Sequence, residues 1–338
     1  MGGRAETFVI VNYGAARARS AWAAARSALD GAGVSFEAHE AREFGDARSA
    51  AAAALREGYR TVAVVGGDGT LGEVVSGYFA GGSSGGAGGA SSPIAINPEA
   101  ALAILPGGTG NDFSRALEGR RATLAHWLAR LVAHCRRDEE DGGGEATTRP
   151  VDVLRGVVAG GRGRSGGEFL CLNAVTLGVG AEVAARVAAQ GPRTRRLPGE
   201  ARFALAALGA LAGWRERRVR IQVDGGEAFE SATNLIAVVN SRFAGGGMMF
   251  SPDARVDDGL ADLVTASRLT RAVVVREMAR VHRGGHVNNP RVLVRRAARV
   301  TIEPLTPDDA LPVEADGDVR GQTPLSLTVM PRALRIVV

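Results

Sequence analysis

The chain has 338 residues, 45% of them hydrophobic and 23% charged, an ordinary mixture for a globular protein long enough for two domains. Its net charge is +5 and all 41 basic residues are arginine, which excludes the phosphate-binding lysine of Walker A and protein-kinase sites. No apolar run approaches the ~20 residues of a membrane span. No aromatic-rich basic stripe favours nucleic acid. Cys135 and Cys171 lack metal-site spacing.

The first 135 residues alternate between strand and helix patterns. Their start, MGGRAETFVIVN, lacks a signal-peptide pattern, so we expect a cytoplasmic protein. Strands are predicted at 7–12, 34–39, 61–65 and 102–105, and helices at 15–29, 47–56 and 71–79. Such alternation predicts an α/β domain with a parallel sheet and helices on both faces, which binds ligands at the carboxyl ends of its strands.

A polar, glycine-rich stretch at 135–150 follows and is interpreted as a linker, and the repetitive segment 80–92 as a flexible loop. Beyond Pro150, short strand patterns dominate. Strands are predicted at 151–158, 168–175, 217–224, 233–240, 260–266, 298–303 and 325–329, with helices at 180–190, 200–214 and 270–282. A succession of many short strands with few helices favours an antiparallel β-sandwich. We therefore predict an α/β domain over 1–149, completed by a returning strand within 330–338, and a β domain over 150–329.

The stretch VVGGDGTLGEVV (64–75) places an acid, Asp68, inside a glycine turn between a strand and a helix. Taken alone, it could be a plain turn, since Asp-Gly is a common turn pair. The alternative is a phosphate cradle, in which anionic oxygens approach backbone N–H groups at a helix start. Asp68 would then repel phosphate without a cation between them, which suggests a nucleotide with Mg²⁺.

A second turn of this kind, LPGGTGNDFSRAL (105–117), follows the next predicted strand. Asn111 and Asp112 could simply cap the helix that begins there. Two such turns on neighbouring strands, each with an acid beside glycines, are stronger evidence for a nucleotide site than either alone.

These two motifs together resemble the catalytic domain of the diacylglycerol kinase family, which includes bacterial lipid kinases and sphingosine kinases. Three later stretches resemble the family in the same order: LNAVTLGVGAEVAARV (172–187), GGGMMFSPDARVDDGLADLV (245–264) and VEADGD (313–318). The resemblance covers nearly the whole chain. It implies a nucleotide-binding α/β domain, a β-sandwich domain, and transfer of the ATP γ-phosphate to a lipid hydroxyl in a cleft between them.

The resemblance also implies roles for particular residues. The implied nucleotide-binding residues are Asn12, His39, Gly66, Gly67, Asp68, Gly69, Thr70, Leu71, Gly72, Glu73, Gly108, Thr109 and Asn111. Asp68 and Asp112 are implied around a catalytic Mg²⁺. A second, structural Mg²⁺ is implied at Asp258, with main-chain oxygens of Arg255 and Leu260.

Asp68 and Asp318 are the implied catalytic residues, with Asp318 as the general base. Asp318 stands where the family usually has glutamate, and Asp316 is the alternative for the base. Other departures are Tyr13 in place of the proline that usually follows Asn12, and His39 in place of a frequent threonine.

Two alternatives stay open. One is an NAD kinase-like enzyme, which shares the Gly-Gly-Asp-Gly-Thr turn, although no clear dinucleotide-recognition motif is present. The other is a non-catalytic nucleotide- or membrane-binding relative. A Rossmann dehydrogenase is disfavoured because GGDGTLG does not follow the first predicted strand of the chain.

Arginine clusters flank an apolar helical segment within 191–220, which predicts peripheral attachment to anionic membranes. The apolar face of this segment is better explained by packing in the core, so the prediction rests on the arginines. The expected partners are ATP, a lipid alcohol and a membrane surface, with no nucleic acid. The lipid and the oligomeric state, including a homodimer, are left open.

Overall fold

The computed structural model describes residues 6–80, 93–139, 147–159, 166–191, 194 and 199–338. Two compact units emerge from the internal contacts, Met1–Asp152 with Arg332–Val338, and Val153–Pro331. The chain passes from one unit to the other within two strands, β7 (Thr148–Ala159) and β18 (Asp318–Val337). Most of the loop predicted at 80–92 and the middle of the linker predicted at 135–150 lie outside the described residues.

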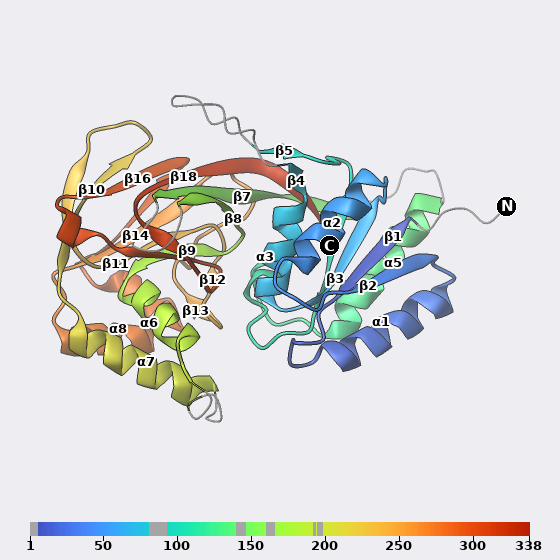
Figure 1. The fold of residues 1–338 in the computed structure, drawn as a ribbon, viewed down its shortest axis with the longest axis horizontal. Helices are drawn as coiled ribbons and strands as arrows, with labels where there is room; N and C mark the ends of the chain where they lie inside the picture. The colour runs from blue at the N-terminus through green and yellow to red at the C-terminus, as the bar shows by residue number, and fades with distance from the viewer. Residues whose placement is uncertain (1–5, 81–92, 140–146, 160–165, 192–193, 195–198) are drawn as a thin grey trace. The chain divides into compact units, whose positions relative to one another are not determined.

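The first unit contains the predicted parallel sheet, in the order β2, β1, β3, β6 and the last residues of β18 (Figure 1). Its strands are β1 (Thr7–Val11), β2 (Phe36–Glu40), β3 (Thr61–Gly66) and β6 (Ala101–Pro106). Both β3 and β6 are apolar and largely buried, as strands covered on two faces must be.

Helices α1 (Ala18–Ala32) and α5 (Leu124–Glu139) cover one face of this sheet with apolar side chains that include Leu29, Trp127 and Leu131. Helices α2 (Asp46–Arg56) and α3 (Asp68–Gly77) pack against each other and against β1 and β3 (Figure 1). A short hairpin, β4 (Phe79–Ala80) and β5 (Ile94–Ala95), and helix α4 (Asp112–Glu118) complete the unit. Helix α3 starts three residues earlier than predicted, so Asp68 is its first residue.

The second unit is the predicted antiparallel β domain, and six of its strands close into a barrel. Each barrel strand pairs with two others, in the cycle β9, β11, β10, β16, β18, β17 and back to β9. These strands are β9 (Ala174–Gly178), β10 (Arg217–Val223), β11 (Phe229–Val239), β16 (Arg299–Pro304), β17 (Pro312–Ala315) and β18. Closure buries the core of the unit, which includes Leu177, Ile221 and Ile236.

The remaining elements of this unit extend or cover the barrel strands. They are β8 (Gly167–Cys171), β12 (Phe243–Ala244), β13 (Met248–Met249), β14 (Ala261–Ser267), β15 (Val292–Ala297), α6 (Val179–Ala188), α7 (Gly199–Gly213), α8 (Arg271–Val281), and the 3₁₀ turns η2 (Gly285–Asn288) and η3 (Pro307–Asp309). β14 pairs with β11, and β15 pairs with β14. All three predicted helices are present, and they share one apolar cluster.

Several strand predictions in this half were wrong in detail. The strand predicted at 168–175 is two strands, β8 and β9, because the chain bends at Leu172 and Asn173. β15 and β17 were not predicted, and 325–329 and 333–338 belong to one long strand, β18. Short strands are weakly specified by their own residues, since pairing partners decide whether they form.

Close contact between α2 and α3 depends on Gly77. A Cβ at this position would lie 2.4 Å from the Arg48 carbonyl oxygen and 2.9 Å from the Ala51 Cβ. A Cβ at Gly72, in the same helix, would meet nothing within 4 Å.

We therefore expect Gly77→Ala to lower the free energy of unfolding by about 1–3 kcal/mol, as overpacking does. Gly72→Ala should raise it by roughly 0.5–1 kcal/mol through helix propensity. Denaturant titration of the two variants measures both effects, and equal stability changes would contradict the proposed helix contact.

Candidate functional site

The two glycine turns lie side by side at the carboxyl ends of β3 and β6, as predicted. Gly66 and Pro106 are partners in the sheet, and the Gly107 N–H donates to the Gly66 carbonyl at 2.7 Å. A Cβ on Gly108 would stand 2.5 Å from the Gly67 Cα. The two backbones are thus in direct contact, so a side chain at Gly108 would collide with Gly67, and one at Gly67 would be crowded, with its Cβ 3.2 Å from the Gly108 Cα.

The Asp68 carboxylate joins the two turns. Its Oδ2 accepts the Asp112 N–H at 3.1 Å, and its Oδ1 accepts the Phe113 N–H at 3.2 Å. Those amides open helix α4, whose N-cap residue, Asn111, makes no side-chain capping bond. Asp68 therefore caps a helix that begins 44 residues later in the chain. The alternative of a helix capped locally by the Asn111 side chain is not what the structure shows, and no local signal could have revealed the contact with Asp68.

Two asparagines predicted to contact nucleotide also support the turns. Asn12 donates to the Thr70 hydroxyl at 2.9 Å and accepts the Gly14 N–H at 2.9 Å. Asn111 accepts the Gly108 N–H at 3.1 Å and donates to its carbonyl at 2.9 Å. Their amide groups thus hold the backbone of the turns in place.

Gly69 and Thr109 are exposed, one on each turn. An arginine that sequence reasoning did not single out lies at the second turn, where Arg17 donates to the Gly108 carbonyl at 3.0 Å. Arg17 is exposed, so part of its guanidinium is accessible to solvent. In a chain without lysine, this is a cation beside the predicted phosphate cradle.

His39 and Glu73 both contact the segment around the start of α2. His39 Nε2 lies 2.9 Å from Asp46 Oδ1, and Glu73 accepts the Gly45 N–H at 2.8 Å. The pKa of Asp46 is lowered, first by the Arg42 N–H and then by His39. Contacts of His39 and Glu73 with nucleotide stay predictions.

The Asp68 carboxylate contacts the backbone N–H of Asp112, so the two predicted Mg²⁺ ligands lie at neighbouring helix starts. Asp112 is 3% exposed, while Asp68 is half-buried. Each carboxylate oxygen of Asp68 accepts one N–H and retains a further lone pair, so Asp68 could also contact a cation. In the described part of the chain, no three His, Cys, Asp or Glu side chains gather as a ready-made metal site. Metal binding at Asp68 and Asp112 stays a prediction.

In the second unit, the turn between β17 and β18 is held by Asp316. This residue has a φ of 48°, and Gly317 follows with 96°. The Asp316 carboxylate accepts the N–H groups of residues 172–174, at 2.8, 3.0 and 3.3 Å. Burial raises the pKa of Asp316, although these bonds act in the opposite direction. The Asp316 carboxylate is therefore engaged in the backbone hydrogen bonds that hold this turn.

Asp318, the predicted base, is exposed and pairs with Arg320 at 3.1 Å. Glu314, on the other side of the turn, is 9% exposed and accepts the Thr176 hydroxyl and the Gly317 N–H. Burial raises the pKa of Glu314 from 4.5 to about 7. Sequence reasoning did not single out Glu314, because its unusual environment arises from strand pairing.

Asp258, predicted to bind a structural metal, accepts the Leu260 N–H at 3.1 Å and pairs with Arg296. Arg255 pairs with Asp257 at 3.3 Å. Metal ligation by Asp258, Arg255 and Leu260 stays a prediction.

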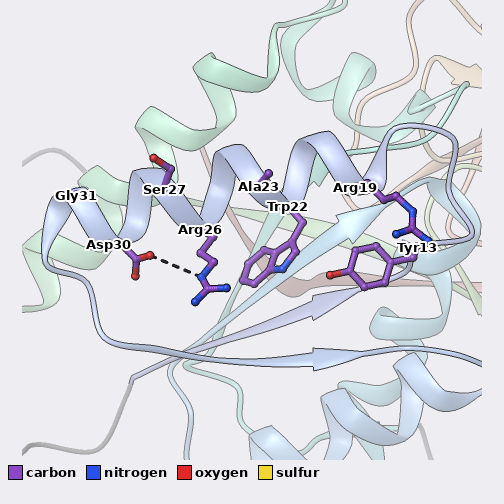
Figure 2. Close-up of a pocket in the computed structure, with 8 residues that line it drawn as sticks. All are labelled: Tyr13, Arg19, Trp22, Ala23, Arg26, Ser27, Asp30 and Gly31. Carbon is purple, nitrogen blue, oxygen red and sulfur yellow. Dashed lines mark ion pairs between the residues drawn. The ribbon is translucent and has the colours of Figure 1, made fainter.

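An open hollow runs along α1 and contains none of the predicted site residues (Figure 2). Trp22, Arg26 and Tyr13 line it, and Arg19 lies over the Tyr13 ring at 5.2 Å. Arg26 is already paired with Asp30 at 3.8 Å. The candidate site is therefore not this hollow but the pair of glycine turns.

Comparison with known proteins agrees with the fold. The family model of the diacylglycerol kinase catalytic domain matches residues 6–138, and that of the YegS C-terminal NAD kinase beta sandwich-like domain matches residues 173–338. A Pseudomonas aeruginosa protein named "Probable lipid kinase YegS-like" is 32% identical over 294 residues, 87% of this chain and 82% of that protein. The Bacillus subtilis diacylglycerol kinase is 24% identical over 307 residues, covering 90% and 86% of the two chains.

Among solved structures, a diacylglycerol kinase from Bacillus anthracis str. Sterne matches with a TM-score of 0.66 and 19% identity, covering 100% of this chain and 98% of that one. This likeness supports the fold. The protein belongs to the diacylglycerol kinase catalytic-domain family, in the bacterial lipid kinase branch whose members carry a YegS-type C-terminal domain.

Asp68→Asn tests the double role of the residue that joins the turns. We expect it to lower the free energy of unfolding by roughly 1–3 kcal/mol, since one buried amide loses a charged acceptor. We also expect it to abolish phosphoryl transfer, since the carboxylate is a predicted metal ligand. Thermal melts and turnover at saturating Mg²⁺ measure the two effects. Asp30→Asn, an exposed acid in the same unit, is the control. Unchanged turnover would contradict the metal role.

Glu314→Gln should alter how stability depends on pH. Because the pKa of Glu314 is raised to about 7, the folded state binds a proton that the unfolded state has released between about pH 4.5 and 7. Stability of the wild type should therefore fall as pH rises through this window. Glutamine lacks this effect, so the variant should gain about 2–4 kcal/mol relative to wild type between pH 5 and 8. Glu303→Gln, at an exposed glutamate of the same unit, is the control, and a pH-independent difference for Glu314→Gln would refute the raised pKa.

Proposed function

We propose that this protein is an ATP-dependent kinase that transfers the γ-phosphate of ATP to a hydroxyl group of a lipid such as diacylglycerol. The observation that carries the proposal is the pair of touching glycine turns joined by Asp68. Side-chain-free backbone beside a helix N-terminus favours bound phosphate. The names of the relatives support the lipid as acceptor.

The roles of the residues follow from the chemistry of the transfer. Phosphoryl transfer needs alignment and charge neutralisation more than covalent help. Gly69 and Thr109 are exposed on the turns to contact nucleotide, and Arg17 supplies positive charge at the second turn. Mg²⁺, held by Asp68 and Asp112, would neutralise charge on the phosphates when bound.

A lipid hydroxyl becomes a strong nucleophile only when a base removes its proton. Asp318 is the proposed base. Its carboxylate is exposed, and its hydrogen bond in the turn is to Arg320, whereas Asp316 is held by three backbone amides. The geometry therefore favours Asp318 over Asp316 for a role that requires contact with substrate.

Peripheral membrane attachment from the cytoplasmic side is part of the proposal, because the acceptor lipid is in a bilayer. Leu205 and Leu208 of α7 are 54% and 63% exposed, while Ala206, Ala210 and Leu211 pack inward. Of the predicted arginine clusters, the part at 192–198 lies largely outside the described residues. Arg218 on the other side pairs with Glu230 at 2.7 Å. Exposed leucines thus support attachment more directly than the described arginines.

No helix in the described ranges is long and apolar enough to span a membrane.

The deciding experiment incubates the full chain with labelled ATP and a panel of lipid alcohols, including diacylglycerol, a sphingoid base and ceramide, in vesicles with and without anionic lipid. NAD is the control substrate. Phosphorylation of one lipid, faster on anionic vesicles, is the expected result. Labelled NADP instead would indicate the NAD kinase-like alternative. Nucleotide binding without any transfer would indicate a non-catalytic relative.

Asp318→Ala should lower turnover by about 10²–10⁴-fold with little change in nucleotide affinity, because proton removal matters in the transition state. Asp318→Glu should retain substantial activity. Asp316→Ala should instead lower the melting temperature, since it leaves three amides without their acceptor. Exposed Asp308→Ala is the control. Loss of turnover in a well-folded Asp316→Ala, with Asp318→Ala nearly silent, would move the base to Asp316.

A further inference from the structure

The segment before β14 concentrates negative charge in a partly buried place. It contributes Asp253, Asp257 and Asp258, and β14 adds Asp262. The side chains of Asp258 and Asp262 are only 17% and 7% exposed. Carboxylates removed from water in this way require a nearby cation or donors that satisfy them.

An arginine from the neighbouring strand supplies that cation. Arg296 on β15 is the direct antiparallel partner of Asp262 on β14. Side chains at such positions project on the same face of the sheet and reach one another. The guanidinium pairs with Oδ2 of Asp258, and its Nε lies 3.7 Å from Oδ1 of Asp262. One side chain therefore bridges two acids that are four residues apart.

The other carboxylate oxygens of these two acids are used by donors of the protein. Oδ1 of Asp258 accepts the Leu260 N–H at 3.1 Å, and Oδ2 of Asp262 accepts the Ser251 hydroxyl at 2.5 Å. Asp257 is paired with Arg255. Within the described ranges, no three potential metal-ligating side chains gather here or elsewhere.

A divalent cation and the guanidinium would compete for the same place. The Arg296 side chain is 54% exposed, but its guanidinium holds Oδ2 of Asp258, and a metal ion bound to the same carboxylate would lie a few ångströms from this like charge and be repelled by it. The resemblance to lipid kinases implies a structural Mg²⁺ at Asp258, but the arrangement around Arg296 does not fit one.

We propose that Arg296 is the resident cation of this acidic loop, at the place where the resemblance to lipid kinases implies a structural Mg²⁺, so that the second unit folds without a metal at Asp258. Arginine is suited to this role, because its planar guanidinium can contact two carboxylates at once. The inference is independent of the proposed enzymatic activity.

The test is thermal melting of the full chain without nucleotide, in EDTA and in millimolar Mg²⁺. Wild type should melt at the same temperature in both. Arg296→Ala should melt about 5–10 °C lower in EDTA, because two partly buried carboxylates lose their cation. Added Mg²⁺ should recover part of that loss, since the carboxylates are then open to a metal.

Arg295→Ala is the matched control, because Arg295 is the adjacent residue on β15 and stacks over the Phe229 ring at 4.6 Å instead of pairing with an acid. It should show no Mg²⁺ response. If Arg296→Ala is poorly folded in EDTA, Arg296→Gln is the milder substitution, because it removes the charge but keeps a long polar side chain. A Mg²⁺-dependent rise in wild-type melting temperature that Asp258→Asn abolishes would overturn the proposal, as would an Arg296→Ala variant as stable as wild type in EDTA.

Discussion

The hydrogen bonds from the Asp68 carboxylate to the amides of Asp112 and Phe113 are the interaction on which the candidate site depends. They tie the start of α3 to the start of α4 and hold two glycine turns in backbone contact. Glycine alone permits that contact, but it leaves the turns flexible, because glycine loses the most conformational entropy on folding. A charged acceptor between two helix starts offsets this cost. The structural need for the carboxylate and its predicted contact with a metal are compatible, since each oxygen has lone pairs for both.

In the second unit, too, a carboxylate that accepts backbone N–H groups holds a turn. Asp316 accepts three backbone amides from the bend between β8 and β9, and Glu314 accepts the Gly317 N–H within the turn. Both carboxylates are thus engaged in hydrogen bonds within the protein, Glu314 also with the Thr176 hydroxyl, whereas Asp318 beside them is exposed. Both units thus place a buried or half-buried carboxylate behind a glycine-containing turn. In each case the carboxylate orders the turn on which the exposed candidate residues lie.

Arginine performs every cationic role in this lysine-free chain, and the structure shows how varied these roles are. Arg17 contacts the carbonyl of a glycine turn, Arg320 pairs with the proposed base, and Arg296 bridges two acids of one loop. Because arginine stays charged at any pH at which the protein is folded, these contacts persist where those of a buried lysine could be lost by deprotonation.

The sequence by itself determined the class of each unit, the order of the motifs and the place of both glycine turns, because hydrophobic periodicity and glycine position act locally. Parallel pairing of β3 with β6 then followed from the general behaviour of alternating strands and helices. Only the tertiary structure decided which side chains serve the turns. Asp68 caps a helix 44 residues away, and Asp316 contacts amides more than 140 residues away. Arg296 meets Asp262 through strand register. Such contacts depend on how distant segments pair, and residue patterns within a short window carry no information about that pairing.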